Sequence, residues 1–440
     1  MRIRRGEQVR GEISLPGDKS ISHRAAMIGA IAEGTTEISN FGPSADCVTT
    51  LRCLDRLGVK IKTGVDLVTV RGVGKTGFAA PSSELDCGNS GTTTRLLAGI
   101  LAGHRFRTRM TGDRSLSSRP MQRIIRPLSK MGARVRSLDG KLPIEIEGAT
   151  PLKGIAYDLP VASAQIKSCL LFAGLNADDI TTVTEPVSTK RGPVSRDHTE
   201  RMLEAFGADI ELKDRKEDGG YKHSISISGA SELKGRPVSV PGDISSAAFL
   251  IAAAAGLEGS ELIIRDVGIN PTRRAIVDAV IEMGADLDVA EKEAAGGEPI
   301  ADIVVRGGLE PLSGPYRIAG SVVANLIDEL PVLAVLGTRL AGGLEVRNAE
   351  ELRLKESDRI DAVVSNLRKM GAEVEEYNDG FGVGNSQLIG ARVDSFGDHR
   401  IAMAFAIAGL FADGETAISG HECVDVSFPG FFRVLSDIVS

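Results

Sequence analysis

The sequence predicts an α/β protein that is divided into two domains of three similar units each. The first reason is length, because 440 residues are more than one hydrophobic core ordinarily supports. The other reasons are two sequence signals that recur in regular order along the chain. One is a helix end followed by a glycine and a strand, and the other is a helix start rich in glycine and serine.

The first signal combines apolar residues at helical spacing, a glycine where the backbone turns left-handed, and alternating strand residues. Chance similarity of helix ends is the alternative, and regular recurrence argues against it. The copies are LDRLGVKI (54–61), LSKMGARV (128–135), LEAFGADI (203–210), VIEMGADL (280–287) and LRKMGAEV (367–374), with glycines at 58, 132, 207, 284 and 371.

The second signal occurs six times, and successive copies begin 71, 74, 80, 78 and 77 residues apart. The sixth copy has no glycine partner before the sequence ends, so we expect the N-terminal segment to complete the sixth unit. The copies are GDKSISHRAA (17–26), GNSGTTTRLL (88–97), ASAQIKSCLL (162–171), GDISSAAFLI (242–251), GSVVANLIDELPVL (320–333) and GDHRIAMAFA (397–406).

A second apolar-periodic stretch lies between the two signals in most units, for instance at 44–57, 120–131 and 197–206. Each unit therefore reads as strand, helix, strand, helix and then strands. We expect one discontinuous domain, 1–18 with 240–440, and a second domain, 19–239, so that the chain crosses between them near 17–20 and 239–242.

Composition and charge exclude some classes of partner and limit how an anionic ligand can be held. The net charge is −7, aromatic residues make up 4% and tryptophan is absent, which argues against a nucleic-acid partner. An anionic ligand then needs a local cluster of cations. The longest apolar runs, 247–257 and 401–412, are too short to cross a bilayer, and no secretory signal is visible. Five cysteines without metal spacing suggest free thiols, so we expect a cytoplasmic protein.

The segment GVGKTG (72–77) fits the glycine pattern of dinucleotide-binding loops, but FAAPSS follows it in place of a helix. Because that motif needs a helix N-terminus to hold the pyrophosphate, we interpret the segment as a glycine-rich hairpin. The six histidines are scattered and form no metal-binding array.

Several of the repeated helix starts carry cations or polar donors. A helix N-terminus already attracts anions through its unpaired N–H groups and partial positive charge. Six such starts facing a common space predict a positive interior suited to more than one anionic group. The side chains are Lys19, Ser20 and Arg24; Asn89, Gly91 and Thr92; Ser163 and Gln165; and His399 and Arg400.

Three further segments contribute charged side chains. Arg119 precedes Pro120, which places it at a turn or helix entry. In ELRLKESDRI (351–360), helical spacing puts Lys355 and Arg359 on one face, although a salt-bridged exposed helix is an equal alternative. Asp328 and Glu329 interrupt the apolar stretch 322–337, which makes Asp328 a candidate general base or, alternatively, a plain salt-bridge partner.

Six motifs together resemble the EPSP synthase (3-phosphoshikimate 1-carboxyvinyltransferase) family, over residues 10 to 435. They are LPGDKSISHRA, GNSGTTTRLLAG, TGDRSLSSRPM, VASAQIKSCLLFAGL, LRLKESDRI and GDHRIAMAFAIAGL. The resemblance implies a two-domain inside-out α/β barrel of six βαβαββ repeats, three per domain, with the active site in the interdomain cleft. It also implies transfer of the enolpyruvyl group of phosphoenolpyruvate to the 5-hydroxyl of shikimate 3-phosphate, by a monomer that needs no metal or organic cofactor.

The resemblance also implies the site residues. Asp328, Glu356 and Lys19 are the expected catalytic residues, with Asp328 taking the 5-hydroxyl proton and Glu356 protonating the methylene carbon. Shikimate 3-phosphate is expected at Lys19, Ser20, Arg24, Ser163, Gln165, Asp328 and Lys355. Phosphoenolpyruvate is expected at Lys19, Gly91, Arg119, Gln165, Arg359 and Arg400.

Two positions depart from the family pattern. Val426 stands where many relatives have a lysine, and Arg196 stands near a position where some have a tyrosine. The alternative within the fold is UDP-N-acetylglucosamine 1-carboxyvinyltransferase, which needs a cysteine in the loop before Arg119. That loop has no cysteine here, and no cysteine is near it in the sequence. A binding protein that lost its chemistry is the other alternative, and the intact acid–base residues argue against it.

Overall fold

The computed structural model describes residues 1–292 and 297–440, and these form two compact units. We call residues 17–240, together with Gly297 and Glu298, the middle unit. Residues 1–16, 241–292 and 299–440 form the terminal unit. The chain therefore passes from one unit to the other after Pro16 and again after Val240.

The middle unit contains three four-stranded sheets with one common strand order, β14-β3-β5-β4, β6-β7-β9-β8 and β10-β11-β13-β12. In each sheet the first two strands run parallel and the others pair antiparallel. The strands are β3 Glu33–Ser39, β4 Lys60–Thr63, β5 Leu67–Val73, β6 Leu85–Asp86, β7 Arg107–Thr111, β8 Arg134–Ser137, β9 Ile144–Glu147, β10 Ala156–Asp158, β11 Thr181–Thr184, β12 Ile210–Glu217, β13 Gly220–Ile227 and β14 Val238–Ser239.

Seven helices accompany these sheets in the described part of the middle unit. They are α1 Lys19–Ile31, α2 Ala45–Arg56, α3 Gly91–Leu101, α4 Arg114–Ser118, α5 Gln122–Lys130, α6 Ala164–Gly174 and α7 His198–Ala205.

The terminal unit repeats the same plan with sheets β2-β15-β17-β16, β18-β19-β21-β20 and β22-β23-β1. Its strands are β1 Arg2–Arg4, β2 Arg10–Ser14, β15 Glu261–Gly268, β16 Ala285–Lys292, β17 Ile300–Leu309, β18 Tyr316–Ile318, β19 Leu344–Val346, β20 Val374–Tyr377, β21 Gly380–Val383, β22 Arg392–Asp394 and β23 Glu415–Ser419. Its helices are α8 Ile244–Gly256, α9 Ala275–Glu282, α10 Val322–Leu326, α11 Leu330–Gly337, α12 Arg359–Lys369, α13 His399–Phe411 and α14 Phe431–Ile438, with 3-10 turns η1 Glu350–Leu354 and η2 His421–Val426.

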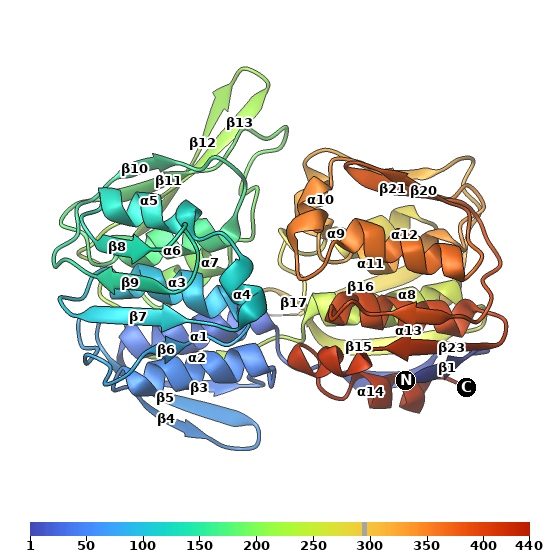
Figure 1. Cartoon of the computed structure of the whole chain (residues 1–440), viewed down its shortest axis with the longest axis horizontal. Helices are drawn as coiled ribbons and strands as arrows, with labels where there is room; N and C mark the ends of the chain where they lie inside the picture. The colour runs from blue at the N-terminus through green and yellow to red at the C-terminus, as the bar shows by residue number, and fades with distance from the viewer. Residues whose placement is uncertain (293–296) are drawn as a thin grey trace. The chain divides into compact units, whose positions relative to one another are not determined.

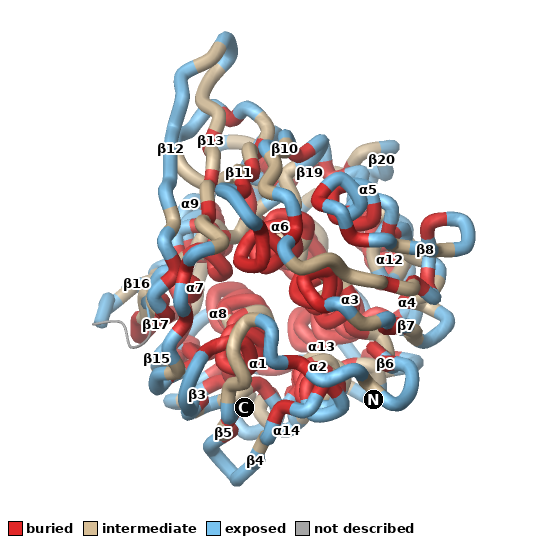
Figure 2. The backbone as a smooth tube through the Cα atoms, turned by 90° about the vertical axis from the view of Figure 1, so that its left-hand side faces the viewer, coloured by how far each residue is buried: buried red, intermediate tan, exposed pale blue. Residues whose placement is uncertain are grey.

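The helices of the second signal lie inside each unit and the sheets lie outside, as Figures 1 and 2 show. All thirteen residues of α8 and all thirteen of α13 are buried, so these helices are surrounded by protein on every side. Close packing of such helices requires small residues. A Cβ on Gly99 of α3 would lie 2.1 Å from the carbonyl oxygen of Cys169 in α6, so only glycine fits there.

The N-terminal segment supplies strands to two sheets. β1 pairs antiparallel with β23 and so gives the sixth unit a third strand, although that sheet has no fourth. β2 pairs parallel with β15 and serves as the first strand of the fourth unit. The first unit likewise takes its first strand, β14, from the end of the middle segment of the chain.

The structure confirms the repeated signals. All five predicted glycines have positive φ, between 81° and 103°, and each predicted helix start begins a helix. The stretch 322–337 differs from expectation, because it forms two helices that are separated at residues 327–329. Lys355 and Arg359 also do not share a helix: Lys355 follows η1, and Arg359 begins α12 because Asp358 caps it.

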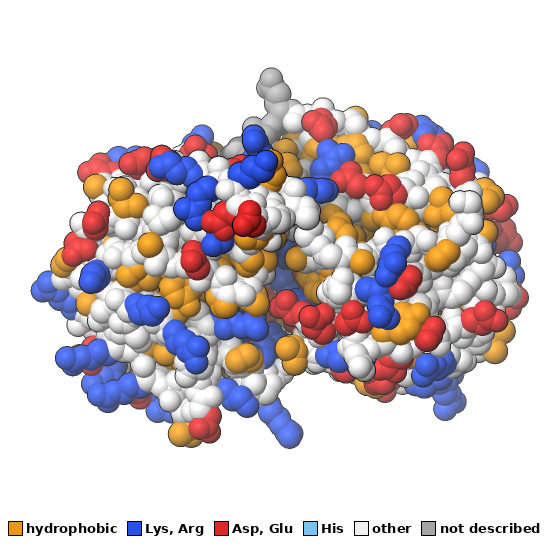
Figure 3. Space-filling view, turned by 90° about the horizontal axis from the view of Figure 1, so that it is seen from above, with side chains coloured by type: hydrophobic (Ala, Val, Ile, Leu, Met, Phe, Trp, Pro, Cys, Tyr) orange, Lys and Arg blue, Asp and Glu red, His pale blue; other side chains and the backbone are white. Residues whose placement is uncertain are grey.

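The charged side chains, the apolar helices and the cysteines can each be compared with the expectations from composition. Lysine and arginine are interspersed with aspartate and glutamate on the face that Figure 3 shows. No helix in the described residues combines the length and the apolar character that a membrane crossing needs. All five cysteines are unpaired thiols, four of them buried and Cys423 half-buried.

Candidate active site

In the middle unit, the predicted residues gather at the starts of three buried helices. Lys19 is the first residue of α1, Gly91 is the first residue of α3, and Ser163 is the N-cap of α6. Asp18 and Ser90 cap α1 and α3 through their side chains, whereas the Ser163 hydroxyl makes no capping hydrogen bond. The N–H groups at these helix starts favour anionic ligands.

Gln165 ties the starts of α3 and α6 together. Its Nε2 donates to Thr92 Oγ1 at 3.1 Å, and its Oε1 accepts a hydrogen bond of 2.7 Å from Arg95. Gly91 lies against Arg95, because an added Cβ would lie 2.6 Å from Nη1 of that arginine. Arg119 follows α4 and donates to Asn89 Oδ1 at 3.1 Å, which brings its guanidinium to the same loop.

Lys19 and Arg24 lie five residues apart on α1 and have different surroundings. Lys19 Nζ lies 3.2 Å from Asp46 Oδ2 and is partly exposed. Arg24 is 3% exposed and donates to Ser20 O, Ser168 Oγ and Thr199 Oγ1 at 2.9, 2.9 and 2.6 Å. Burial lowers the pKa of Arg24, and the nearby carboxylates of Glu200 and Asp18 raise it in part, which gives a value of about 10. The guanidinium therefore remains charged at neutral pH.

In the terminal unit, Asp328 lies between α10 and α11 within reach of three cations. Its Oδ1 is 3.2 Å from Arg359 Nη1, 3.8 Å from Arg400 Nε and 3.9 Å from Lys355 Nζ. Arg400 also donates to the Asp328 carbonyl oxygen at 3.1 Å. The break between the two helices therefore presents both the carboxylate and the carbonyl of this residue to the cations.

Arg359 connects three acidic residues of the terminal unit. Its Nη2 donates to Glu356 Oε2 at 2.7 Å, and its Nε donates to Asp398 Oδ2 at 2.7 Å. Burial would lower the pKa of Arg359, but Asp398, Glu356 and Asp328 outweigh that effect and hold it above its usual value. Arg359 is fully buried, whereas Glu356 keeps a partly exposed side chain.

The structure thus brings the predicted residues into two groups, one in each unit. The middle-unit group contains Lys19, Ser20, Arg24, Gly91, Arg119, Ser163 and Gln165, and the terminal-unit group contains Asp328, Lys355, Glu356, Arg359 and Arg400. In the described residues, 1–292 and 297–440, no group of three or more metal-ligating side chains is placed to hold a metal ion.

Sequence reasoning missed three residues of these groups. Asp46 pairs with Lys19 from α2, Arg95 holds Gln165, and Asp398 is the counter-ion of Arg359. Arg95 could have been found from the sequence, because it stands four residues after Gly91 in the motif GNSGTTTRLLAG. Asp398 carried a signal only for its other role as the N-cap of α13, where its side chain accepts the Arg400 N–H.

One cysteine, Cys87, lies close in space to the loop before Arg119. Cys87 is far in sequence from the loop before Arg119, yet its backbone N–H donates to Thr111 O at 2.9 Å at the base of that loop. The Cys87 side chain is fully buried, with its thiol directed to Leu85 O. It therefore does not provide the accessible loop thiol that the alternative activity needs.

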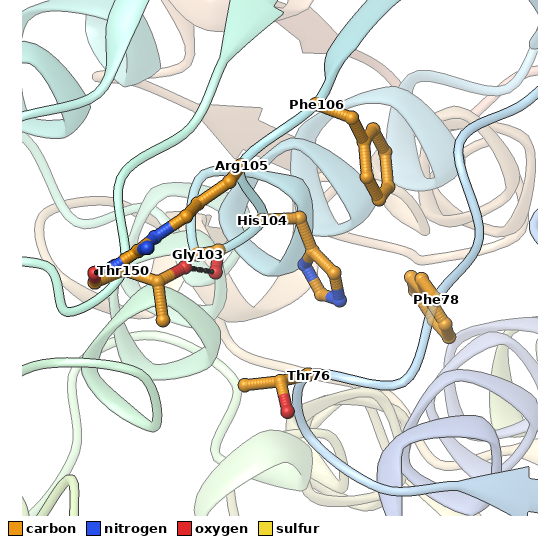
Figure 4. Close-up of a pocket in the computed structure, with 7 residues that line it drawn as sticks. All are labelled: Thr76, Phe78, Gly103, His104, Arg105, Phe106 and Thr150. Carbon is orange, nitrogen blue, oxygen red and sulfur yellow. Dashed lines mark hydrogen bonds between the residues drawn. The ribbon is translucent and has the colours of Figure 1, made fainter.

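A cavity of about 230 Å³ lies elsewhere in the middle unit (Figure 4). It is lined by His104, Phe78 and Phe106 among others, and the His104 ring stacks on Phe78 with centroids 5.1 Å apart. His104 follows the C-terminal end of α3, whereas Gly91 begins that helix. The cavity therefore lies at the opposite end of α3 from Gly91 and shares no residue with the two groups.

Comparisons with known proteins agree on one family. The family model for EPSP synthase (3-phosphoshikimate 1-carboxyvinyltransferase) matches residues 3–435. A curated 3-phosphoshikimate 1-carboxyvinyltransferase of Brevibacillus brevis is 50% identical, covering 100% of this chain and 99% of the relative. One from Desulforamulus reducens is 48% identical, with 98% of each chain covered.

Solved structures support the same relationship. An EPSP synthase from Acinetobacter baumannii superposes with a TM-score of 0.87 at 43% identity, covering 100% of this chain and 98% of that chain. The enolpyruvyl transferase NikO from Streptomyces tendae has a TM-score of 0.76 at 18% identity and shows the fold alone. The predicted fold class is confirmed.

Proposed function

The chain belongs to the EPSP synthase (3-phosphoshikimate 1-carboxyvinyltransferase) family, and we propose that its two groups of residues divide the work of that family's reaction. The protein transfers the enolpyruvyl group of phosphoenolpyruvate to the 5-hydroxyl of shikimate 3-phosphate and releases phosphate. This reaction belongs to the shikimate pathway. Addition of the hydroxyl gives a tetrahedral intermediate, and elimination of phosphate restores the double bond.

Asp328 is the proposed base for the 5-hydroxyl. Arg359 and Arg400 lie 3.2 and 3.8 Å from its Oδ1. When the carboxylate and phosphate of phosphoenolpyruvate pair with these arginines, they compete with Asp328 for the positive charge. The Asp328 carboxylate therefore becomes a better proton acceptor when phosphoenolpyruvate is bound.

Glu356 is the proposed acid that protonates the methylene carbon and takes the proton back during elimination. Its partly exposed carboxyl is held by Arg359 at 2.7 Å, which fixes its direction. Using one group in both steps is consistent, because protonation turns the methylene into a methyl group, and that methyl group must lose one proton for the double bond to form again.

Phosphoenolpyruvate is proposed to bind to Lys19, Gly91, Arg119, Gln165, Arg359 and Arg400. Guanidinium groups suit its carboxylate and phosphate because they bind such anions through two parallel N–H groups. The start of α3 at Gly91 adds backbone N–H groups and the positive end of a helix. Developing negative charge on the departing phosphate is stabilised by the same groups.

Shikimate 3-phosphate is proposed to bind to Lys19, Ser20, Arg24, Ser163, Gln165, Asp328 and Lys355. The Ser163 hydroxyl stands at the start of α6 without a capping bond, so it can donate to the phosphate. Arg24 already donates at least three N–H groups within the protein, so it offers the phosphate only those that remain.

These assignments require the middle-unit and terminal-unit groups to act on one pair of substrates, and we propose that each unit is a domain and that the reaction takes place in the cleft between the two. The proposal rests mainly on one observation: Asp328 lies within 4 Å of three cations, Lys355, Arg359 and Arg400. A binding protein would need the cations but not a carboxylate among them.

Phosphate release tests the proposal. The protein is incubated with phosphoenolpyruvate and shikimate 3-phosphate, and separately with phosphoenolpyruvate and UDP-N-acetylglucosamine. We expect release only in the first mixture, and Arg119→Ala and Arg400→Ala should each raise KM for phosphoenolpyruvate at least 10-fold. Unchanged KM values in both folded variants would overturn the assignment of these arginines, and release only in the second mixture would overturn the choice of acceptor.

We further propose that the enzyme works as a monomer in the cytoplasm without a metal or organic cofactor. The reaction moves protons and phosphate but transfers no electrons to or from a cofactor, and the side chains above supply the acid, the base and the cations. Full activity after treatment with a chelator, together with a monomeric mass in solution, is the expected result.

A further inference from the structure

A cluster of three buried charges lies next to Arg24, and the proposed mechanism does not use it. The cluster consists of Lys167 on α6, Glu185 after β11 and Glu200 on α7. Lys167 Nζ lies 2.7 Å from Glu200 Oε1 and 3.3 Å from Glu185 Oε1. All three side chains are at most 4% exposed. A charged lysine this deeply buried is uncommon and needs an explanation.

The ammonium of Lys167 lies among three oxygen-bearing groups. Besides the two ion-pair contacts with the carboxylates, Lys167 Nζ donates a hydrogen bond to Ser195 O at 3.1 Å. Burial would lower the pKa of Lys167, but Glu200 and Glu185 outweigh it and raise the value, so the lysine is charged. Glu185 in turn accepts the Val194 and Ser195 N–H groups at 2.8 and 3.0 Å.

Such a cluster is a poor source of stability. Charged groups lose their hydration on burial, and replacing a buried ion pair by apolar residues is often neutral or stabilising. The neighbours of Lys167 in α6, such as Ile166 and Leu170, show that the helix is otherwise built as an apolar core. The cluster is better explained by the position that it imposes on the surrounding elements.

The position concerned is that of Arg24. Lys167 is followed by Ser168 on α6, and Glu200 is preceded by Thr199 on α7. Ser168 Oγ and Thr199 Oγ1 lie 2.6 Å apart, and they accept hydrogen bonds from Arg24 Nη2 and Nε. The ion pair and the two hydroxyls that hold Arg24 thus come from adjacent residues on the same two helices.

We propose that Lys167 is a positioning residue for binding of shikimate 3-phosphate: its ion pair with Glu200 holds α6 and α7 at the separation at which Ser168 and Thr199 together direct the Arg24 guanidinium. The inference rests on the proposed role of Arg24. Phosphoenolpyruvate binding is affected little, because Arg119, Arg359 and Arg400 belong to neither α6 nor α7. Gln165 lies on α6 but is held by Thr92 and Arg95 of α3.

The test measures KM for each substrate in the full-length Lys167→Met enzyme. We expect KM for shikimate 3-phosphate to rise at least 10-fold and KM for phosphoenolpyruvate to stay within twofold. Thr199→Val removes one acceptor of Arg24 without changing the ion pair and should show the same split. Lys153→Met, at an exposed lysine of the middle unit, is the matched control and should change neither KM.

Loss of Lys167 leaves Glu200 without its cation, so the single variant can fail to fold. The double variant Lys167→Met/Glu200→Leu removes that ion pair, while Glu185 keeps its hydrogen bonds from the Val194 and Ser195 N–H groups. It should fold while keeping the raised KM for shikimate 3-phosphate. A folded double variant with wild-type KM values would show that the cluster is only structural and would overturn the inference. Arg24→Lys distinguishes failure of the Lys167 inference from failure of the proposed role of Arg24. If Arg24→Lys leaves KM for shikimate 3-phosphate unchanged, Arg24 does not bind this substrate, and the proposed role of Arg24 is wrong together with the inference.

Discussion

Arg359 and Asp398 form a buried ion pair, with Arg359 Nε 2.7 Å from Asp398 Oδ2 and both side chains at most 1% exposed. The arginine begins α12 and the aspartate caps α13, so the pair joins the starts of two helices. The same guanidinium holds Glu356 and lies 3.2 Å from Asp328. The position of Arg359 therefore sets the position of both proposed acid–base residues.

Asp398→Asn should destabilise the terminal unit. The amide keeps the shape of the carboxylate but leaves Arg359 with a weaker partner in a buried place, and breaking a buried pair costs about 3–5 kcal/mol. We expect the urea midpoint to fall accordingly at pH 7. Asp361→Asn, at an exposed position in α12, is the control and should leave the midpoint nearly unchanged. Equal midpoints for Asp398→Asn and the wild type would mean that the pair does not stabilise the fold.

The stabilising effect of Asp398 should also depend on pH. Burial would raise the pKa of Asp398, but Arg359 and His399 outweigh it, so the pKa lies below its usual value. The carboxylate therefore contributes its full stability above a pH of about 4, and the contribution is lost as pH falls further. Urea midpoints of wild type and Asp398→Asn should differ most at pH 6–7 and converge below about pH 4. A constant difference over this range would contradict the ion-pair account.

Asp328→Asn tests the proposed base. The amide can still accept a hydrogen bond from Arg359 but takes up no proton, so we expect kcat to fall about 10²-fold or more while both KM values change little. Steady-state kinetics with each substrate varied in turn give the three parameters. If kcat is retained and only KM rises, Asp328 positions the substrates and another group takes the proton.

The repeated helix starts account for what the sequence could predict. Lys19, Gly91, Ser163 and Arg400 each stand within three residues of such a start, so local pattern alone located them. The glycines after the helices were equally predictable, because a left-handed backbone position favours glycine whatever the rest of the fold.

Contacts between distant elements could not be predicted in this way. Asp398 lies 39 residues from Arg359, and Arg95 lies 70 residues from Gln165, so only the fold brings them together. Local pattern also failed where capping competes with helix continuation. Ser357 and Asp358 interrupt the helical spacing between Lys355 and Arg359, because Asp358 accepts backbone N–H groups at the start of a new helix.

Gly91→Ala should weaken binding of phosphoenolpyruvate. The added methyl group would lie 2.6 Å from Arg95 Nη1 and 3.5 Å from Arg119 Nη1, so the Arg95 guanidinium must move. Because Arg95 holds Gln165 at 2.7 Å, that movement also displaces a proposed ligand-binding side chain. We expect KM for phosphoenolpyruvate to rise about 10-fold, with stability almost unchanged because the end of a flexible side chain can shift. An unchanged KM would indicate that Gly91 does not border the substrate.

His23 should make the stability of the middle unit depend on pH between about 4 and 6. Its ring is fully buried in α1 and its Nδ1 lies 2.6 Å from Thr50 Oγ1. Burial lowers the pKa of His23 to about 3, against about 6.5 in an unfolded chain. Below pH 6.5 the unfolded state takes up a proton that the folded state refuses, so stability is complete above that pH and is lost as pH falls towards 3.

Between the two pKa values, the free energy of unfolding should fall by about 1.4 kcal/mol for each pH unit. Between pH 7 and pH 5 the expected fall is about 2 kcal/mol. His23→Gln keeps a group that can bond to Thr50 but does not titrate, so urea midpoints of this variant should fall less steeply with pH than those of the wild type. His421→Gln, at a partly exposed ring in the terminal unit, is the control and should retain the wild-type slope. Equal slopes for His23→Gln and the wild type would show that the folded protein accommodates a protonated His23.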